Sequence, residues 1–378
     1  MKRIFLFFLL LFWFGSFWGQ NLNYFSKSDS LVNQILKLQS TGNTFYNKGI
    51  FPSQRGKVKK KEDDNIFFSS IIAFTLQKLK NDLGLQSGLI ADSICIGVIS
   101  NYVNYKNKTG INTYNFWQTN PPKFFPNSKL LSRNDFFNTP DDADDCSIIY
   151  LTDTSLHSNR LWLKDKLAKH ANTATLKIKS TYKSYRNYKA YSTWFGKNMP
   201  VEFDICVESN ILYFVYENKL PLNENDSATV ALIKSMILSG KYIKDAAFVS
   251  ASYKKPSIIL YHLARLLGKF NIPELNDCRE IIKKDIEREL QNEPDFMEKV
   301  ILSTSLIRMG GKPKPLVYPA ALEKEMEHFV FFNADIFSPY ARPSLKFISK
   351  SKVFAIPFYC KAWCLTLLLE YEVERNKP

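Results

Sequence analysis

The sequence is poor in histidine and has no spacing typical of a metal site. Its four histidines form no HExxH or similar pattern, so metal catalysis through imidazole has little support. The six cysteines lie far apart, mostly inside apolar segments, and lack the short spacing of zinc ligands. An exported chain could pair some of them, and Cys360 and Cys364 are one helical turn apart, but buried unpaired cysteine is the default. We therefore expect no metal and no cofactor.

The chain also lacks the short motifs of phosphate and nucleophile chemistry. No glycine-rich phosphate loop, nucleophile elbow or Walker element occurs, and no nucleic-acid-binding motif accompanies the formal charge of +15. The basic residues are scattered except for KVKKK at residues 57–61. A positive charge of this size favours anionic surroundings such as phospholipid headgroups or acidic glycans. We expect peripheral contact with a membrane through the basic surface, and no nucleic-acid partner.

Long apolar runs are missing everywhere except at the start of the chain. The opening MKRIFLFFLLLFWFGSFWGQN has a basic start, an apolar run over residues 4–14 and small residues up to Gly19. This layout is typical of a cleaved signal peptide. The apolar run is about half of the roughly 20 residues that a membrane-spanning helix needs. We therefore expect residues 1–19 to be removed and residues 20–378 to form a single domain that is secreted or periplasmic.

Strand-like alternation is scarce, and residues 173–194 are the one ambiguous region. Elsewhere apolar residues recur at three- and four-residue spacing, as in IIAFTLQKL and ILYHLARLL, which predicts amphipathic helices. Such helices bury their faces either by open-ended stacking or by closing a ring. An acidic start followed by small and apolar residues recurs in several of them, so we expect an all-α (α/α)6 toroid of helical hairpins. The expected helices cover residues 28–39, 64–83, 86–106, 144–152, 156–171, 203–217, 226–238, 256–270, 277–291, 295–309, 319–331 and 353–374.

Four carboxylates crowd the start of one expected helix, at Asp141, Asp142, Asp144 and Asp145. An aspartate at a helix start caps free N–H groups and meets the positive end of the helix dipole, and Pro140 suits such a start. Capping accounts for one or two of the four. Like charges this close raise the pKa of at least one member, which is how an enzyme keeps a carboxylic acid protonated near neutral pH.

The segment Asp142-Ala143-Asp144-Asp145, followed by CSIIYL, resembles the DxDD element of class II terpene cyclases of the squalene-hopene and diterpene type. In that family the element begins an inner helix of an (α/α) toroid. The resemblance implies that Asp144 is the general acid that protonates an alkene or epoxide, with Asp142 and Asp145 as supporting carboxylates. Cys146 stands where the family usually has threonine, and the family's QxxxGxW repeats do not occur.

Aromatic residues make up 15% of the chain, and aromatic faces stabilise the carbocations that alkene protonation forms. Trp117, Trp194 and Phe195 are therefore candidate substrate-binding residues. Asp204 and Glu208 stand four apart on an apolar helix and share one face, so they point into a polar cavity or need buried partners.

Three functions remain open on these residues. The first is a cyclase-like acid catalyst for an isoprenoid-type substrate. The second is a glycan-cleaving hydrolase or lyase, in which Asp144 or Asp145 works with the Asp204 and Glu208 pair as separated carboxyl groups. The third is a cell-envelope binding or scaffold protein without catalysis, in which the acidic residues are helix caps. The sequence leaves open whether the protein is an enzyme.

Overall fold

The computed structural model describes residues 27–123, 140–195, 199–335 and 355–377. The chain is mostly helical and includes one small β-sheet, so the all-α expectation was imprecise. The predicted signal peptide, residues 1–19, lies outside the described residues. The helices are residues 27–38, α2 (Ile66–Leu79), α3 (Leu85–Ile99), α4 (Ala143–Thr152), α5 (Arg160–Lys169), α6 (Ile205–Glu217), α7 (Glu224–Leu238), α8 (Lys241–Lys244), α9 (Ala246–Val249), α10 (Pro256–Lys269), α11 (Arg279–Asn292), α12 (Phe296–Arg308), α13 (Leu322–His328) and α15 (Lys361–Glu374).

Polar caps fix where several of these helices begin. Asn65 caps α2 and Asp142 caps α4, each accepting a hydrogen bond from the backbone N–H three residues later. Asn223 and Asp226 form a capping box at the start of α7. The acidic helix starts in the sequence are therefore partly explained by capping.

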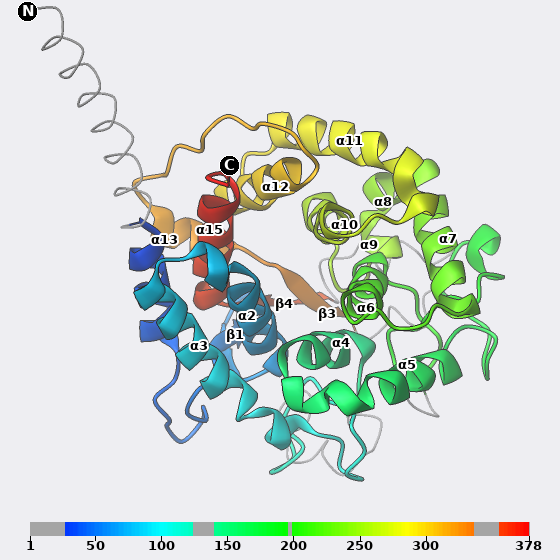
Figure 1. Ribbon diagram of the computed structural model, residues 1–378, viewed down its shortest axis with the longest axis horizontal. Helices are drawn as coiled ribbons and strands as arrows, with labels where there is room; N and C mark the ends of the chain where they lie inside the picture. The colour runs from blue at the N-terminus through cyan, green and yellow to red at the C-terminus, as the bar shows by residue number, and fades with distance from the viewer. Residues whose placement is uncertain (1–26, 124–139, 196–198, 336–354, 378) are drawn as a thin grey trace, which may run out of the picture.

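The most apolar helices contact one another in a closed order (Figure 1). Helix α2 contacts α4, α4 contacts α6, α6 contacts α10, α10 contacts α12, α12 contacts α15, and α15 returns to α2. These helices are buried on nearly all sides, whereas α11 buries only Ile282 and Ile286 and lies at the periphery with α3, α5 and α7. An apolar surface all round a helix is expected where neighbours cover every face. Within the described residues, no helix is long and apolar enough to span a membrane.

A four-stranded antiparallel sheet pairs strands from the first 63 residues with strands from residues 332–359. Its order is β2 (Lys61–Asp63), β1 (Ser53–Arg55), β4 (Ala355–Tyr359) and β3 (Phe332–Asp335). The sequence predicted helix over residues 353–374, but residues 355–359 are a strand and α15 begins only at Lys361. The strands are three to five residues long. Strands this short show too little alternation to be recognised, and a short apolar run reads equally well as the first turn of a helix.

The sheet closes one end of the group of contacting helices. Phe332 of β3 packs against Phe67 and Phe68 at the start of α2, with ring centroids 5.1 and 4.8 Å apart. The backbone N–H of Asn333 donates to the carbonyl oxygen of Ser252, in the loop before α10. The sheet therefore lies at the end where α2, α4, α6 and α10 begin, and it supplies one wall of the cavity described next.

Candidate functional site

A cavity of about 110 Å³ lies at the N-terminal ends of the helices, beside the sheet. This is an order of magnitude more space than one water molecule needs. Three acidic and six aromatic residues line it, and none of the described lining residues is basic. The lining consists of Asp142, Asp144 and Asp145 with Phe67, Phe116, Trp117, Trp194, Tyr253 and Phe332, together with Thr193, Val207, Ser252, Asn333 and Ala334. The predicted residues Trp117, Trp194 and the DxDD carboxylates are thus brought together.

Asp142 and Asp145 are neighbouring carboxyl groups in this cavity, and each affects the pKa of the other. Oδ1 of Asp142 accepts a hydrogen bond from the backbone N–H of Asp145 at 2.7 Å, which is the cap of α4. The side-chain oxygens of Asp145 are fully buried and have no donor among the described residues. Two ionised carboxylates cannot hydrogen-bond to each other, but a protonated Asp145 can donate to Asp142. The pair is therefore built to keep one proton.

Burial is the main reason why both members of the pair are weak acids. It raises the pKa of Asp142 to about 7, with a further contribution from the charge of Asp144. Burial also raises the pKa of Asp145 well above its usual range, and the charge of Asp142 adds to this. Both shifts favour the protonated form of the pair, which titrates as a unit.

Asp144 is placed differently, because donors surround its carboxyl group. Nδ2 of Asn210 donates to one oxygen and the hydroxyl of Tyr253 donates to the other, and Arg265 in turn donates to Oδ1 of Asn210. Burial raises the pKa of Asp144, while Asn210, Tyr253 and the charge of Arg265 all lower it. Among the three cavity carboxyl groups, Asp144 has the most side-chain hydrogen-bond donors to stabilise its ionised form.

Arg265 links this cavity to a second one at the other end of the same helices. The second cavity, of about 250 Å³, lies among the C-terminal ends of α2, α10, α12 and α15, and Arg265 lines it. The contacts from Asp144 through Asn210 to Arg265 therefore run along the inside of the helix group. Asn210 and Arg265 were not among the predicted site residues. The only sequence feature that could have indicated them is that each is a polar side chain on an otherwise apolar helix.

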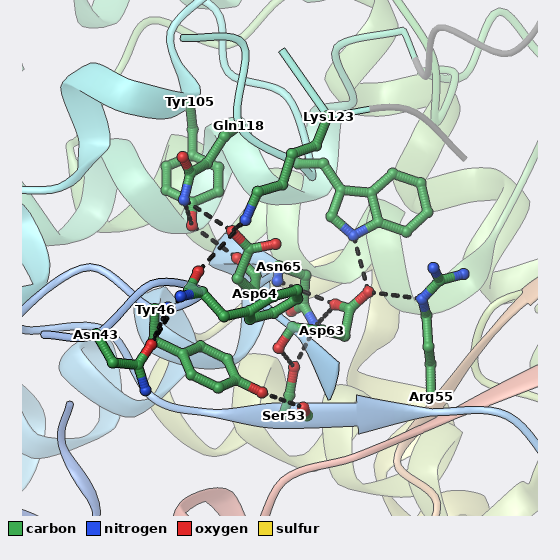
Figure 2. A network of polar contacts seen from close by, with 12 residues as sticks. Asn43, Tyr46, Ser53, Arg55, Asp63, Asp64, Asn65, Tyr105, Gln118 and Lys123 are labelled. Atoms are coloured by element: carbon green, nitrogen blue, oxygen red, sulfur yellow. Dashed lines mark hydrogen bonds and ion pairs between the residues drawn. The ribbon is translucent and has the colours of Figure 1, made fainter. Parts of the chain in front are cut away.

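A buried polar network holds the Trp117 wall in place (Figure 2). Nε1 of Trp117 donates to Oδ2 of Asp63 at 2.9 Å, and Nε of Arg55 lies 3.0 Å from the same oxygen. The backbone and side-chain nitrogens of Asn65 donate to the other oxygen of Asp63. Nearby, Asp64 accepts hydrogen bonds from Gln118 and Lys123. Sequence reasoning missed this network, although its two aspartates repeat the acidic helix start seen at α4.

The two predicted aromatic neighbours Trp194 and Phe195 have different surroundings. Trp194 lines the cavity, its Nε1 donates to Glu202 at 2.6 Å, and its backbone bridges to Asp142. Phe195 is buried against the ring of His170, 5.5 Å away between centroids, and does not line the cavity. Adjacent residues in extended backbone point to opposite sides, which explains why only one of them faces the cavity.

Asp204 and Glu208 do not line the cavity either. Asp204 has extended backbone as the cap of α6, and it accepts hydrogen bonds from the backbone of Cys206 at 3.0 Å, from Ser250 Oγ at 2.6 Å and from the backbone of Ser252 at 3.0 Å. It therefore anchors the loop that leads to Tyr253. Glu208 is fully buried, and neither of its oxygens has a partner among the described residues.

These acids predict an unusual dependence of stability on pH. Burial raises the pKa of Asp204 to about 6 from its ordinary 3.8, and burial followed by the charge of Asp204 raises the pKa of Glu208 well above its usual range. The folded state then binds more protons than the unfolded state, so the free energy of unfolding falls as pH rises. Asp204 alone contributes about 3 kcal/mol over the interval between its two pKa values. The Asp204 part of this fall lies between about pH 4 and pH 6, and Glu208 extends it to higher pH, so urea unfolding between about pH 4 and pH 8 should show it.

His262 acts in the opposite direction and offsets part of this fall below about pH 6.5. Burial and the charge of Arg265 lower the pKa of His262 well below its usual range, so its contribution is lost as pH falls below about 6.5. Glu208→Gln tests whether Glu208 causes part of this pH dependence. The variant should be more stable than the wild type near pH 8 and equal to it near pH 5. A stability that rises steadily toward pH 8 would contradict the proton balance described above.

No cluster of three or more histidine, cysteine or acidic side chains in the described residues is arranged to hold a metal ion. The six cysteines are all buried and free. The cap and first turn of α4 contribute Asp142, Asp144 and Asp145 to the cavity lining, and Cys146 does not line it. In comparisons with known proteins, the chain matches no protein-family model and no curated protein.

Proposed function

We propose that the protein is a cyclase-like or isomerase-like acid catalyst that protonates an alkene in an isoprenoid-type substrate. The observation that carries this proposal is the Asp142 and Asp145 pair, which keeps a proton inside a cavity walled by aromatic rings. An apolar substrate suits such walls, and a carboxylic acid held neutral near pH 7 is the form that can donate a proton. The closed order of helix contacts supports an (α/α)6 toroid as the architecture around it.

In the proposed step, the π electrons of the alkene form a new C–H bond with the proton of the pair. The O–H bond breaks, the pair becomes doubly ionised, and the neighbouring carbon becomes cationic. The faces of Trp117, Trp194 and Tyr253 stabilise that positive charge, as does the carboxylate of Asp144. Loss of a proton from the cation back to the pair completes the cycle.

The contacts support a different division of roles from the one that the resemblance implies. Asn210 and Tyr253 both donate to Asp144, which favours its ionised form. Asp145 receives no such donor and keeps its proton. We therefore propose the pair as the acid, with Asp142, about 8% exposed, as the member closer to substrate and Asp144 as the stabilising carboxylate.

The glycan-cleaving alternative depended on Asp204 and Glu208 sharing the cavity with the other acids. Since neither residue lines the cavity, we do not propose that function. The apolar start of the chain still supports the proposal that residues 1–19 are a signal peptide and that the protein acts in the periplasm or outside the cell. Peripheral membrane contact through the basic surface would bring it close to an apolar substrate.

The direct test is turnover of linear isoprenoid alkenes in D₂O. The purified protein should release isomerised or cyclised products that carry one deuterium on a former alkene carbon, as measured by mass spectrometry. Glu208→Gln is the matched control, because it removes a buried carboxyl group of α6 that does not line the cavity, and it should keep activity. Unchanged alkenes across a panel of chain lengths would overturn the proposal and favour the non-catalytic binding or scaffold alternative.

A further inference from the structure

The acidic residues that line the cavity have no basic counterpart among the described residues that line it. Asp142, Asp144 and Asp145 all line the space, and no lysine, arginine or histidine in the described part of the chain does. Both oxygens of Asp145 are buried without a donor among the described residues. A buried charge of this kind is costly unless a positive group compensates it.

The nearest arginines compensate this charge only in part. Arg265 acts on Asp144 through Asn210 and lines the second cavity. Arg55 lies behind the aromatic wall, 5.6 Å from the Trp117 ring centroid, and is paired with Asp63. Among the described basic residues, Arg265 therefore reaches the cavity carboxyl groups only through an amide, whereas the lining itself supplies three acidic side chains.

The walls of the cavity suit an organic cation. The Phe67 ring lies 5.1 Å from Phe332 and 6.1 Å from Tyr253, and the Phe116 ring lies 4.9 Å from Trp117 and 5.7 Å from Phe332. All five of these aromatic residues line the same cavity as the three aspartates. Aromatic faces attract alkylated ammonium groups, and carboxylates supply the opposite charge.

We propose that this cavity binds a small organic cation whose head group is an alkylated ammonium. The aromatic rings hold its alkyl substituents while Asp144 and the Asp142 and Asp145 pair balance its charge. A bare metal ion fits less well, because the described side chains offer no cluster of oxygen, nitrogen and sulfur ligands suited to one. The inference needs only the charge and shape of the cavity and does not depend on turnover of an alkene.

Calorimetric titration with tetramethylammonium chloride tests the inference. We expect saturable binding with one ion per chain, and no binding of potassium chloride or of tert-butanol, which resembles the ligand in size but carries no charge. Asp144→Asn should weaken binding by about tenfold, and Trp194→Leu should weaken it by a similar factor. Glu208→Gln should bind like the wild type, and thermal unfolding of each variant verifies that it is folded.

Three results would overturn the inference. The first is absence of saturable binding by the folded wild type, and the second is equal affinity of the wild type and Asp144→Asn. Equal binding of tert-butanol would likewise show that the cavity selects for shape and not for charge. A protein that binds the ammonium ion but leaves isoprenoid alkenes unchanged retains this inference and loses the proposed catalytic function.

Discussion

Asp145→Asn is expected to lower the turnover of an alkene substrate by about 10²- to 10⁴-fold while leaving the fold intact. The amide has nearly the shape of the protonated acid but cannot supply its proton. The fold should tolerate the change, because the Asp145 side chain accepts no hydrogen bond from the described residues, and burial, which raises its pKa, favours a neutral group at this position. Turnover measured under substrate saturation, together with urea unfolding, checks both halves of the prediction.

Asp144→Asn distinguishes the two assignments of the acid. If the Asp142 and Asp145 pair supplies the proton, Asp144→Asn should retain more activity than Asp145→Asn, because it loses stabilisation of the cation but keeps the proton source. The opposite order of activities would return the acid to Asp144, as the resemblance to class II terpene cyclases implies. Near pH 8, Asp145→Asn should also be at least as stable as the wild type, because it no longer places a titratable group in the core.

Asp63→Ala is expected to lower the free energy of unfolding by about 3–5 kcal/mol, because it leaves the charge of Arg55 in a buried position without its carboxylate. Arg55 and Asp63 are 5% and 1% exposed, so water cannot replace the lost partner. The substitution also removes the acceptor of Trp117 Nε1 and the two hydrogen bonds from Asn65. Equilibrium urea unfolding measures the loss, and tetramethylammonium affinity should fall as the Trp117 wall loosens.

Two further variants separate charge from packing in that network. Asp64→Ala is the matched control: its partner Lys123 is 24% exposed and can turn to water, so we expect a loss of about 1–2 kcal/mol. The double variant Arg55→Met with Asp63→Leu removes both charges and should recover part of the stability lost in Asp63→Ala. A cost of less than about 1 kcal/mol for Asp63→Ala would mean that Arg55 finds another partner.

The helix starts were predictable because they depend on neighbouring residues. The acidic cluster after Pro140 caps α4 through Asp142, and the positions of α6, α10 and α12 follow from apolar spacing in their own segments. The same local reasoning was wrong at residues 355–359, where a strand pairs with β1 about 300 positions earlier in the chain. A pairing at that separation leaves no periodic signal in either segment.

Helical spacing also misled the interpretation of Asp204 and Glu208. A separation of four places two side chains on one face only if both residues are helical. Asp204 precedes α6 and has extended backbone, so its carboxyl group turns back to cap the helix and to hold the loop at Ser250 and Ser252. Glu208 lies inside the helix and is buried away from the cavity.

The sequence by itself determined the helical character of the chain, the acidic start of α4 and the enrichment in aromatic residues, because spacing, capping and composition are local properties. Only the tertiary structure decided which side chains share a cavity. It brought Tyr253, Asn210 and Phe332 to the carboxyl groups of α4, and it kept Phe195 and Glu208 away. These contacts join segments from 66 to about 190 residues apart, and their formation depends on how whole helices pack against one another.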